Sequence, residues 1–290
     1  MKQIVLSDRI ANARRLDRVA GAVRDATGKV LPQGKVKDVL HGLWQGHPIH
    51  PALAQFTFGC FTGAALLDVT GSPGATPLIR FGIAGSLPTA VTGLADYSAA
   101  HEEQQRVGLV HGLANVAGLL CYAGSLRLRA KGGRGGGALA LAGYGLLAGA
   151  ATLGGELSFR WATGPNHAAE VPHAGPADWT DIGSVADFAP DQPARRMAGL
   201  IPVMVLAHDG DFLVLHDRCA HMAAPLHQGE ITTTDGVPCV TCPWHHSVFR
   251  MTDGSVVHGP ATAPQPVLDV RVRDGQLQVK VREIPGVDAS

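Results

Sequence analysis

Hydrophobic and polar positions divide the chain into two unlike parts. The middle third carries four long apolar segments, at residues 52–69, 78–95, 107–126 and 137–159. Each segment approaches or exceeds the roughly 20 residues that a helix needs to cross the hydrocarbon core of a bilayer. A buried soluble bundle is the alternative, but four consecutive segments of this length rarely lack a polar face. The pattern therefore predicts four transmembrane helices.

The pattern changes after Arg160, where short β-branched runs replace the long apolar segments. These runs lie at residues 201–217, 237–242 and 266–281, and two of them contain an Asp-Gly turn between alternating strands. They predict a small antiparallel β domain. A stretch rich in Pro, Gly and Ala at residues 163–178 is typical of a linker between the two parts.

The first 45 residues lack the apolar run of a secretory signal, so no cleavable signal is expected. Their apolar side chains recur near helical spacing with arginines between them, which predicts an amphipathic helix on the membrane surface or against the bundle. These side chains are Ile10, Leu16, Val19, Ala20 and Val23. We expect an N-terminal segment at 1–45, a membrane domain at 46–162, the linker, a β domain at 179–283 and a tail at 284–290.

The formal net charge at pH 7 is zero, so nothing predicts a nucleic-acid partner, and lipid is the expected surrounding of the four helices. Two of the five cysteines, Cys60 and Cys121, fall in the apolar segments, where a packing role is expected. Cys239 forms a Cys-x-x-Cys with Cys242, but its place in an expected strand predicts a packed thiol.

Two short loops of the β domain each offer one thiol and one imidazole. The first is Cys219-Ala-His221 and the second is Cys242-Pro-Trp-His245. Such loops can build a tetrahedral zinc site, or a two-iron cluster with both cysteines on one iron and both histidines on the other. Both kinds of site use nitrogen and sulfur donors, so the spacing alone leaves the two open.

The sequences CAHMAAPLHQGEI, at 219–231, and CPWHHSVFRMTDGSVVHGPATAPQPVLDVRVRDGQLQV, at 242–279, resemble the Rieske iron–sulfur domain family. The resemblance spans about residues 179–282 and includes both loops, the Asp-Gly hairpin and the Gly-Pro-Ala loop. It implies an antiparallel β sandwich with a cluster-binding subdomain, and it favours a [2Fe-2S] cluster over zinc. It also implies four ligands, two on each iron: Cys219 with Cys242, and His221 with His245.

Residues beside these ligands are expected to tune the cluster. Respiratory Rieske proteins have a further cysteine in each loop, and Ala224 and Trp244 stand at those positions, so their disulfide cannot form. Ser247 stands where a hydroxyl donates to a cluster sulfur in high-potential members, whereas Phe249 lacks the usual tyrosine hydroxyl. These features predict an intermediate potential within the Rieske range of roughly −150 to +300 mV. His246 replaces the usual glycine, either as a proton acceptor or as a solvated side chain.

The apolar half resembles a bacterial four-helix membrane domain of unassigned function over about residues 46–168. The motifs that carry this resemblance are GHPIHPAL at 46–53, GLADY at 93–97, HGLAN at 111–115 and LGGELSFRWATGPNHA at 153–168. The resemblance implies a topology but no activity.

Three histidines, His47, His50 and His111, fall toward the membrane face at which a four-span chain both begins and ends. Three interpretations stay open. The histidines are axial ligands of haem b, with His50 and His111 as the best pair; or they bind a quinol and accept its proton; or they hydrogen-bond interfacial loops without carrying electrons.

The sequence thus predicts a four-transmembrane-helix bundle followed by an all-β Rieske-type domain. We expect a membrane-anchored carrier that moves single electrons between a quinol, haem or soluble donor and a partner oxidoreductase, without catalytic residues of its own. A redox sensor or assembly subunit is the alternative. The short stretch after the second loop leaves no expected room for a mononuclear-iron oxygenase domain. The basic N-terminal residues and the lack of a disulfide predict that the β domain lies on the cytoplasmic side of the bacterial cell membrane.

Overall fold

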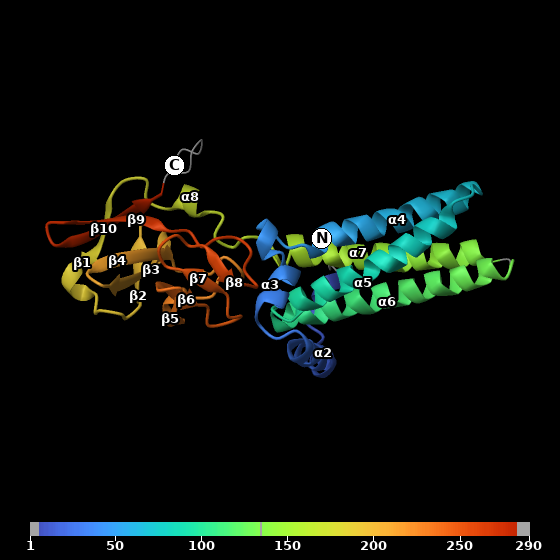
Figure 1. Ribbon diagram of the computed structural model, residues 1–290, viewed down its shortest axis with the longest axis horizontal. Helices are drawn as coiled ribbons and strands as arrows, with labels where there is room; N and C mark the ends of the chain where they lie inside the picture. The colour runs from blue at the N-terminus through green and yellow to red at the C-terminus, as the bar shows by residue number, and fades with distance from the viewer. Residues whose placement is uncertain (1–5, 134, 283–290) are drawn as a thin grey trace. The chain divides into compact units, whose positions relative to one another are not determined.

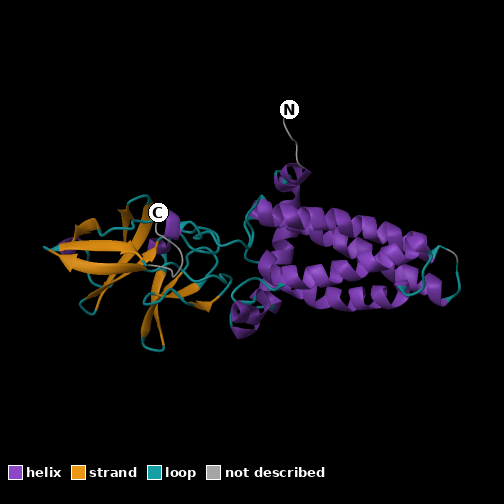
Figure 2. Ribbon diagram, turned by 90° about the horizontal axis from the view of Figure 1, so that it is seen from above, coloured by secondary structure: helices purple, strands orange, loops and turns teal. Residues whose placement is uncertain are grey.

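The computed structural model describes residues 6–133 and 135–282, which divide into two compact units between Gly164 and Pro165. The first unit is helical and the second is built mainly of strands (Figure 1 and Figure 2). The predicted tail at 284–290 lies outside the described residues. The two-part fold class predicted from the sequence is confirmed.

Short helices precede the bundle. They are α1 (Leu6–Ala11), α2 (Asp17–Val30) and α3 (Lys35–His41), with the 3-10 turns η1 (Arg14–Leu16) and η2 (Leu43–Gln45). The apolar positions expected on one amphipathic helix are therefore divided between α1, η1 and α2. The inner side of α2 includes Ala20, which is buried, whereas Val19 is half exposed.

Four long helices follow, each long and apolar enough to cross a membrane, as predicted. They are α4 (His50–Thr70), α5 (Ala75–Tyr97), α6 (Glu102–Ala130) and α7 (Gly136–Phe159). Pro51 occupies the first turn of α4, where its missing N–H leaves no helical hydrogen bond unmade. The helix α4 packs mainly on α5, and α6 mainly on α7. Phe61, Ile79, Tyr122 and Leu147 are buried between the helices.

The second unit contains ten described strands and a short helix, α8 (Val171–Ala174). The strands are β1 (Thr180–Ser184), β2 (Ala194–Ala198), β3 (Ile201–His208), β4 (Asp211–His216), β5 (Glu230–Thr234), β6 (Val237–Thr241), β7 (Val248–Arg250), β8 (Val256–His258), β9 (Leu268–Arg273) and β10 (Gln276–Val281). They form three antiparallel sheets, in the orders β1-β10-β9, β2-β3-β4 and β5-β6-β7-β8.

Three of the two-residue turns in this unit are Asp-Gly pairs. They are Asp209–Gly210, Asp235–Gly236 and Asp274–Gly275, and each residue has a positive φ. Two-residue hairpin loops of this conformation match the twist of the flanking strands, which is why Asp-Gly is favoured there. The turns at 209–210 and 274–275 lie in the runs that predicted hairpins.

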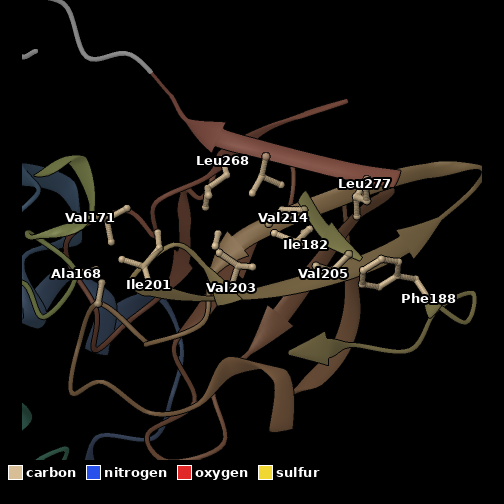
Figure 3. Packing of buried hydrophobic residues seen from close by; sticks show 13 residues of the cluster. Ala168, Val171, Ile182, Phe188, Ile201, Val203, Val205, Val214, Leu268 and Leu277 are labelled. Carbon is tan, nitrogen blue, oxygen red and sulfur yellow. The ribbon is translucent and has the colours of Figure 1, made fainter. Parts of the chain in front are cut away.

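The strand β3 joins two hydrophobic cores, because its alternate side chains point to opposite faces. Val203 and Val205 lie in the first core, with Ala168 and Val171 from the expected linker (Figure 3). The segment 165–178 thus belongs to the second compact unit. Met204 belongs to the other core, which lies under the two Cys/His loops.

Candidate metal centre

The first Cys/His loop follows β4 and is closed on itself by backbone hydrogen bonds. The N–H of Cys219 donates to the carbonyl of Ala224 at 2.9 Å, and the N–H of Ala223 donates to the carbonyl of Cys219 at 2.8 Å. Ala223 has φ +58°, a left-handed conformation that reverses the chain tightly. His221 lies within this turn.

The second loop connects β6 to β7 and repeats the same arrangement. The N–H of Cys242 donates to the carbonyl of Ser247 at 2.8 Å, and that of His246 donates to the carbonyl of Cys242 at 3.1 Å. His246 has φ +62°, which corresponds to Ala223 of the first loop and favours glycine. The His246 side chain is exposed.

The structure brings the four predicted ligands together as two pairs. The sulfurs of Cys219 and Cys242 are buried and joined by a hydrogen bond. The imidazole rings of His221 and His245 lie edge to face, with centroids 5.0 Å apart and an interplanar angle of 88°. Their Nδ1 atoms are buried.

The hydrogen bond between the two thiols shifts their pKa values in opposite directions. It lowers the pKa of Cys242 to about 7, against the opposing effect of burial. The same bond, together with burial, raises the pKa of Cys219 well above its usual value. The thiolate is the form that binds a metal, and Cys242 is the thiol of this pair that loses its proton more readily.

These donors fit a two-iron cluster better than one zinc ion. Within residues 6–133 and 135–282, no three His, Cys, Asp or Glu side chains gather where they could hold a single metal ion. A structural zinc needs four such ligands, whereas each iron of a [2Fe-2S] centre of this type takes two. Adjacent sulfurs and adjacent imidazoles supply those two pairs.

Gln265 holds the first loop in place and was not singled out from the sequence. Its buried side-chain oxygen accepts the N–H of Ala220 at 2.8 Å. Its amide nitrogen donates to the carbonyls of His216 and Arg218, at 2.6 and 2.7 Å. A glutamine far along the chain carries no local signal of this role, because only the fold brings it to the loop.

Asp217 supports the same loop from the other side and was also missed. This buried carboxylate accepts the backbone N–H of His227 at 2.8 Å, and its two oxygens lie 2.8 and 3.0 Å from Nδ1 of His227. Arg195 contacts it at 3.3 Å. The sequence offered one indication of this role, which is that Asp217 lies two residues before the ligand Cys219.

The tuning residues lie around the second loop. Ser247 is buried, and its Oγ accepts the N–H of Ala261 at 2.9 Å. Phe249 is buried in the core beneath. Trp244 is 47% exposed, with its ring centroid 6.5 Å from that of His245.

All five cysteines lie in the described residues and are free, so the respiratory disulfide is absent there. Ala224 is buried at one of the two positions where that disulfide would need a cysteine. Cys239 is buried in β6, with its sulfur 3.5 Å from the carbonyl of Val237, as expected of a packed thiol. Cys60 and Cys121 are partly buried in the helical unit.

The three membrane histidines have different surroundings. His47 is exposed, and its Nδ1 lies 3.1 Å from the carbonyl of Pro48. His50 and His111 are half-buried, and each ring lies against a backbone carbonyl of a neighbouring helix. The structure thus sets His50 and His111 between helices and leaves His47 at the surface.

Two family models match the chain, one in each unit. The model of the Rieske [2Fe-2S] domain matches residues 178–279, and that of the predicted membrane protein family DUF2231 matches residues 46–166. Both matches confirm the resemblances inferred from the motifs.

Similar proteins match the second unit. The anthranilate 1,2-dioxygenase ferredoxin subunit of Burkholderia cepacia is 35% identical over 105 residues, which cover 36% of this chain and 94% of the relative. The 3-phenylpropionate/cinnamic acid dioxygenase ferredoxin subunit of Photorhabdus laumondii is 31% identical over 94 residues, covering 32% of this chain and 87% of the relative. A Rieske domain-containing protein of Homo sapiens is 34% identical over 64 residues, covering 21% and 41% respectively.

Proposed function

Because the chain belongs to the Rieske [2Fe-2S] domain family, we propose that it is a membrane-anchored electron carrier that serves a partner oxidoreductase. The observation that carries this proposal is the pair of matching loops, which present two buried sulfurs and two adjacent imidazoles. A [2Fe-2S] cluster held there supplies a site that accepts and releases one electron at a time. The four apolar helices keep this carrier at the membrane.

The residues of the chain itself hold and shield the site. Cys219 and Cys242 would bind one iron, and His221 and His245 the other. The core beneath the loops keeps water from the sulfurs, and Trp244 offers a half-exposed aromatic surface beside His245. Aromatic side chains of this kind are favoured at protein interfaces.

The acceptor is proposed from the relatives. The two bacterial proteins are named as ferredoxin subunits of dioxygenases. By analogy, this chain passes electrons to a partner oxidoreductase, and its donor is a membrane quinol, a haem or a soluble reductase. The β domain lies on the cytoplasmic side, where soluble partners are available.

Electron paramagnetic resonance of the reduced protein in membranes tests the cluster. We expect a Rieske signal that Cys242→Ala abolishes, because the variant removes one sulfur ligand. Cys239→Ala is the matched control, since this buried cysteine lies three positions earlier in the same strand and loop region. A signal that survives Cys242→Ala, or a wild-type protein without one, would overturn the assignment.

The electron-carrier role is tested in membrane vesicles. A soluble ferredoxin reductase should reduce the cluster in inverted vesicles and leave it oxidised in right-side-out vesicles, which also checks the sidedness. Added quinol should reduce it in both if the donor is a membrane quinol. A cluster that is reduced by neither donor would instead support a redox sensor or assembly subunit.

A further inference from the structure

The helical unit contains an internal repeat: the hairpin α4–α5 corresponds to the hairpin α6–α7. Identical residues recur 61 positions apart; for example, His111 lies 61 positions after His50. The matched pairs are His50 and His111, Gly63 and Gly124, Leu78 and Leu139, Gly82 and Gly143, and Gly93 and Gly154. The repeat extends to packing, because a Cβ added at Gly63 would meet the Leu78 side chain and one at Gly124 would meet Leu139.

The two repeated histidines make the same hydrogen bond. Nδ1 of His50 lies 2.9 Å from the carbonyl oxygen of Thr89, and Nδ1 of His111 lies 2.7 Å from that of Ala150. In both cases the carbonyl is 39 positions further along the chain. A carbonyl only accepts, so Nδ1 carries the proton in each ring. Nε2 is then the unprotonated nitrogen, which is the one able to bind a metal.

A glycine makes room for each imidazole on the neighbouring helix. A Cβ added at Gly93 would lie 2.8 Å from Cε1 of His50, and one added at Gly154 would lie 3.1 Å from Cε1 of His111. Both distances are shorter than ordinary contacts. The two hairpins therefore hold their imidazoles in the same way. In each, a glycine on the neighbouring helix leaves room for the ring and a backbone carbonyl accepts its Nδ1 proton.

The hairpins face each other across an approximate two-fold axis along the bundle. Equivalent residues meet at such an axis, as in isologous dimers. Phe61 stacks on its equivalent Tyr122 with ring centroids 4.1 Å apart, and Asp68 pairs with its equivalent Arg129 at 2.5 Å. Each of α4 and α6 packs on both α5 and α7, so α4 and α6 occupy opposite corners of the bundle. His50 and His111 therefore stand at equivalent heights on opposite helices.

We propose that His50 and His111 are the two axial ligands of a b-type haem held between α4 and α6. Haem iron accepts imidazole ligands, and helix bundles build cofactor sites from side chains on facing helices. Backbone carbonyls that fix the Nδ1 proton are the usual second partners of metal-bound imidazoles. Asn115 donates to Nε2 of His111 at 3.1 Å and to its carbonyl at 3.0 Å; iron replaces the first contact and leaves the second.

A haem at this position would be the electron donor of the cluster. This role rests on the proposed function of the chain as an electron carrier. A haem bound there would give one electron to the oxidised cluster as its ferrous iron becomes ferric, and the quinol or soluble reductase named above would reduce it again. His47 takes no part, because it is exposed and its hydrogen bonds in the described part of the chain are with Gln45 and Pro48.

The full-length protein, purified from membranes of cells supplied with a haem precursor, gives the test. We expect one haem b per chain in the pyridine haemochrome assay and a low-spin bis-imidazole signal in electron paramagnetic resonance. His50→Ala and His111→Ala should each lose the haem, and the matched control His47→Ala should keep it. Helical circular dichroism of the same samples reports folding of the bundle, so loss of haem with the helical signal intact is specific.

His50→Met separates ligation from packing. A methionine can replace one axial imidazole and raise the potential of the haem, so the variant should keep haem with an altered spectrum and a higher midpoint. A wild-type protein without haem, or haem retained in both alanine variants, would overturn the proposal. Either result leaves the Rieske signal and the reduction of the cluster by its donor in place, whereas failure of the proposed function removes one of these two.

Discussion

The hydroxyl of Ser247 has one proton to donate and two lone pairs to accept with. The structure assigns one lone pair to the N–H of Ala261, at 2.9 Å, which fixes the oxygen and leaves its proton available. Because the side chain is buried close to Cys242 in the loop, we propose that this proton is donated to a sulfur of the cluster. A hydrogen bond to sulfur stabilises the reduced cluster, which carries one more negative charge, and so raises its potential.

Ser247→Ala is therefore expected to lower the reduction potential of the cluster. A net hydrogen bond of about 1 kcal/mol corresponds to roughly 40 mV for one electron, since about 59 mV is a tenfold change in the equilibrium constant. Redox titration monitored by circular dichroism or paramagnetic resonance measures the shift. Ser255→Ala, in the turn before β8, is the control and should leave the potential unchanged. An unchanged potential in Ser247→Ala would contradict the assigned role of the hydroxyl.

The helix α3 reverses the usual distribution of polar and apolar side chains. Val36 and Val39 are 70% and 57% exposed, while Lys37 is 5% and His41 is 1% exposed. Outward valines suit contact with lipid at the end of the bundle, and the inward residues need partners. His41 finds one in Asp96 of α5, whose Oδ1 lies 2.8 Å from its Nδ1. Burial lowers the pKa of Lys37, against the opposing effect of Asp96.

Asp96→Asn is expected to destabilise the helical unit by about 1–3 kcal/mol, the cost of weakening a buried hydrogen bond to a charged group. Thermal unfolding of the protein in detergent, followed by helical circular dichroism, measures this loss. The matched control is Asp25→Asn, because Asp25 forms an exposed pair with its neighbour Arg24, and exposed pairs contribute little. Equal stabilities of the two variants would show that His41 does not depend on Asp96.

Local patterns predicted most elements, and long-range contacts account for what they missed. Apolar length located the four spans, and Asp-Gly turns located the hairpins at 209–210 and 274–275. The helix α6 begins at Glu102, ahead of the apolar segment 107–126, because Gln104 caps the N–H of His101 at 2.8 Å. The four ligands followed from their spacing and resemblance. The supporting roles of Gln265 and Asp217 could not be predicted in this way, since they depend on segments that meet only in the folded domain.

At the scale of the whole molecule, the chain divides into two units between Gly164 and Pro165, each with its own buried core. Val203, Phe188 and Leu277 belong to the core of the second unit, and Phe61 and Tyr122 to the core of the first. Separate cores are what allow domains to fold alone. The ferredoxin subunit from Burkholderia cepacia is matched over 94% of its length by a part of this chain that covers only 36% of it.

Residues 165–290, expressed without the helical unit, are therefore expected to form a water-soluble domain that binds the cluster. Its paramagnetic resonance signal and reduction potential should equal those of the full chain, because the described contacts of Gln265, Asp217 and Ser247 with the two loops all lie within this segment. The control is a shorter fragment, residues 180–290. It lacks Ala168 and Val171, two buried residues of the first core, and should be less stable to heat. A shifted signal in residues 165–290 would mean that the helical unit contributes to the cluster's surroundings, and would contradict the independence of the two units.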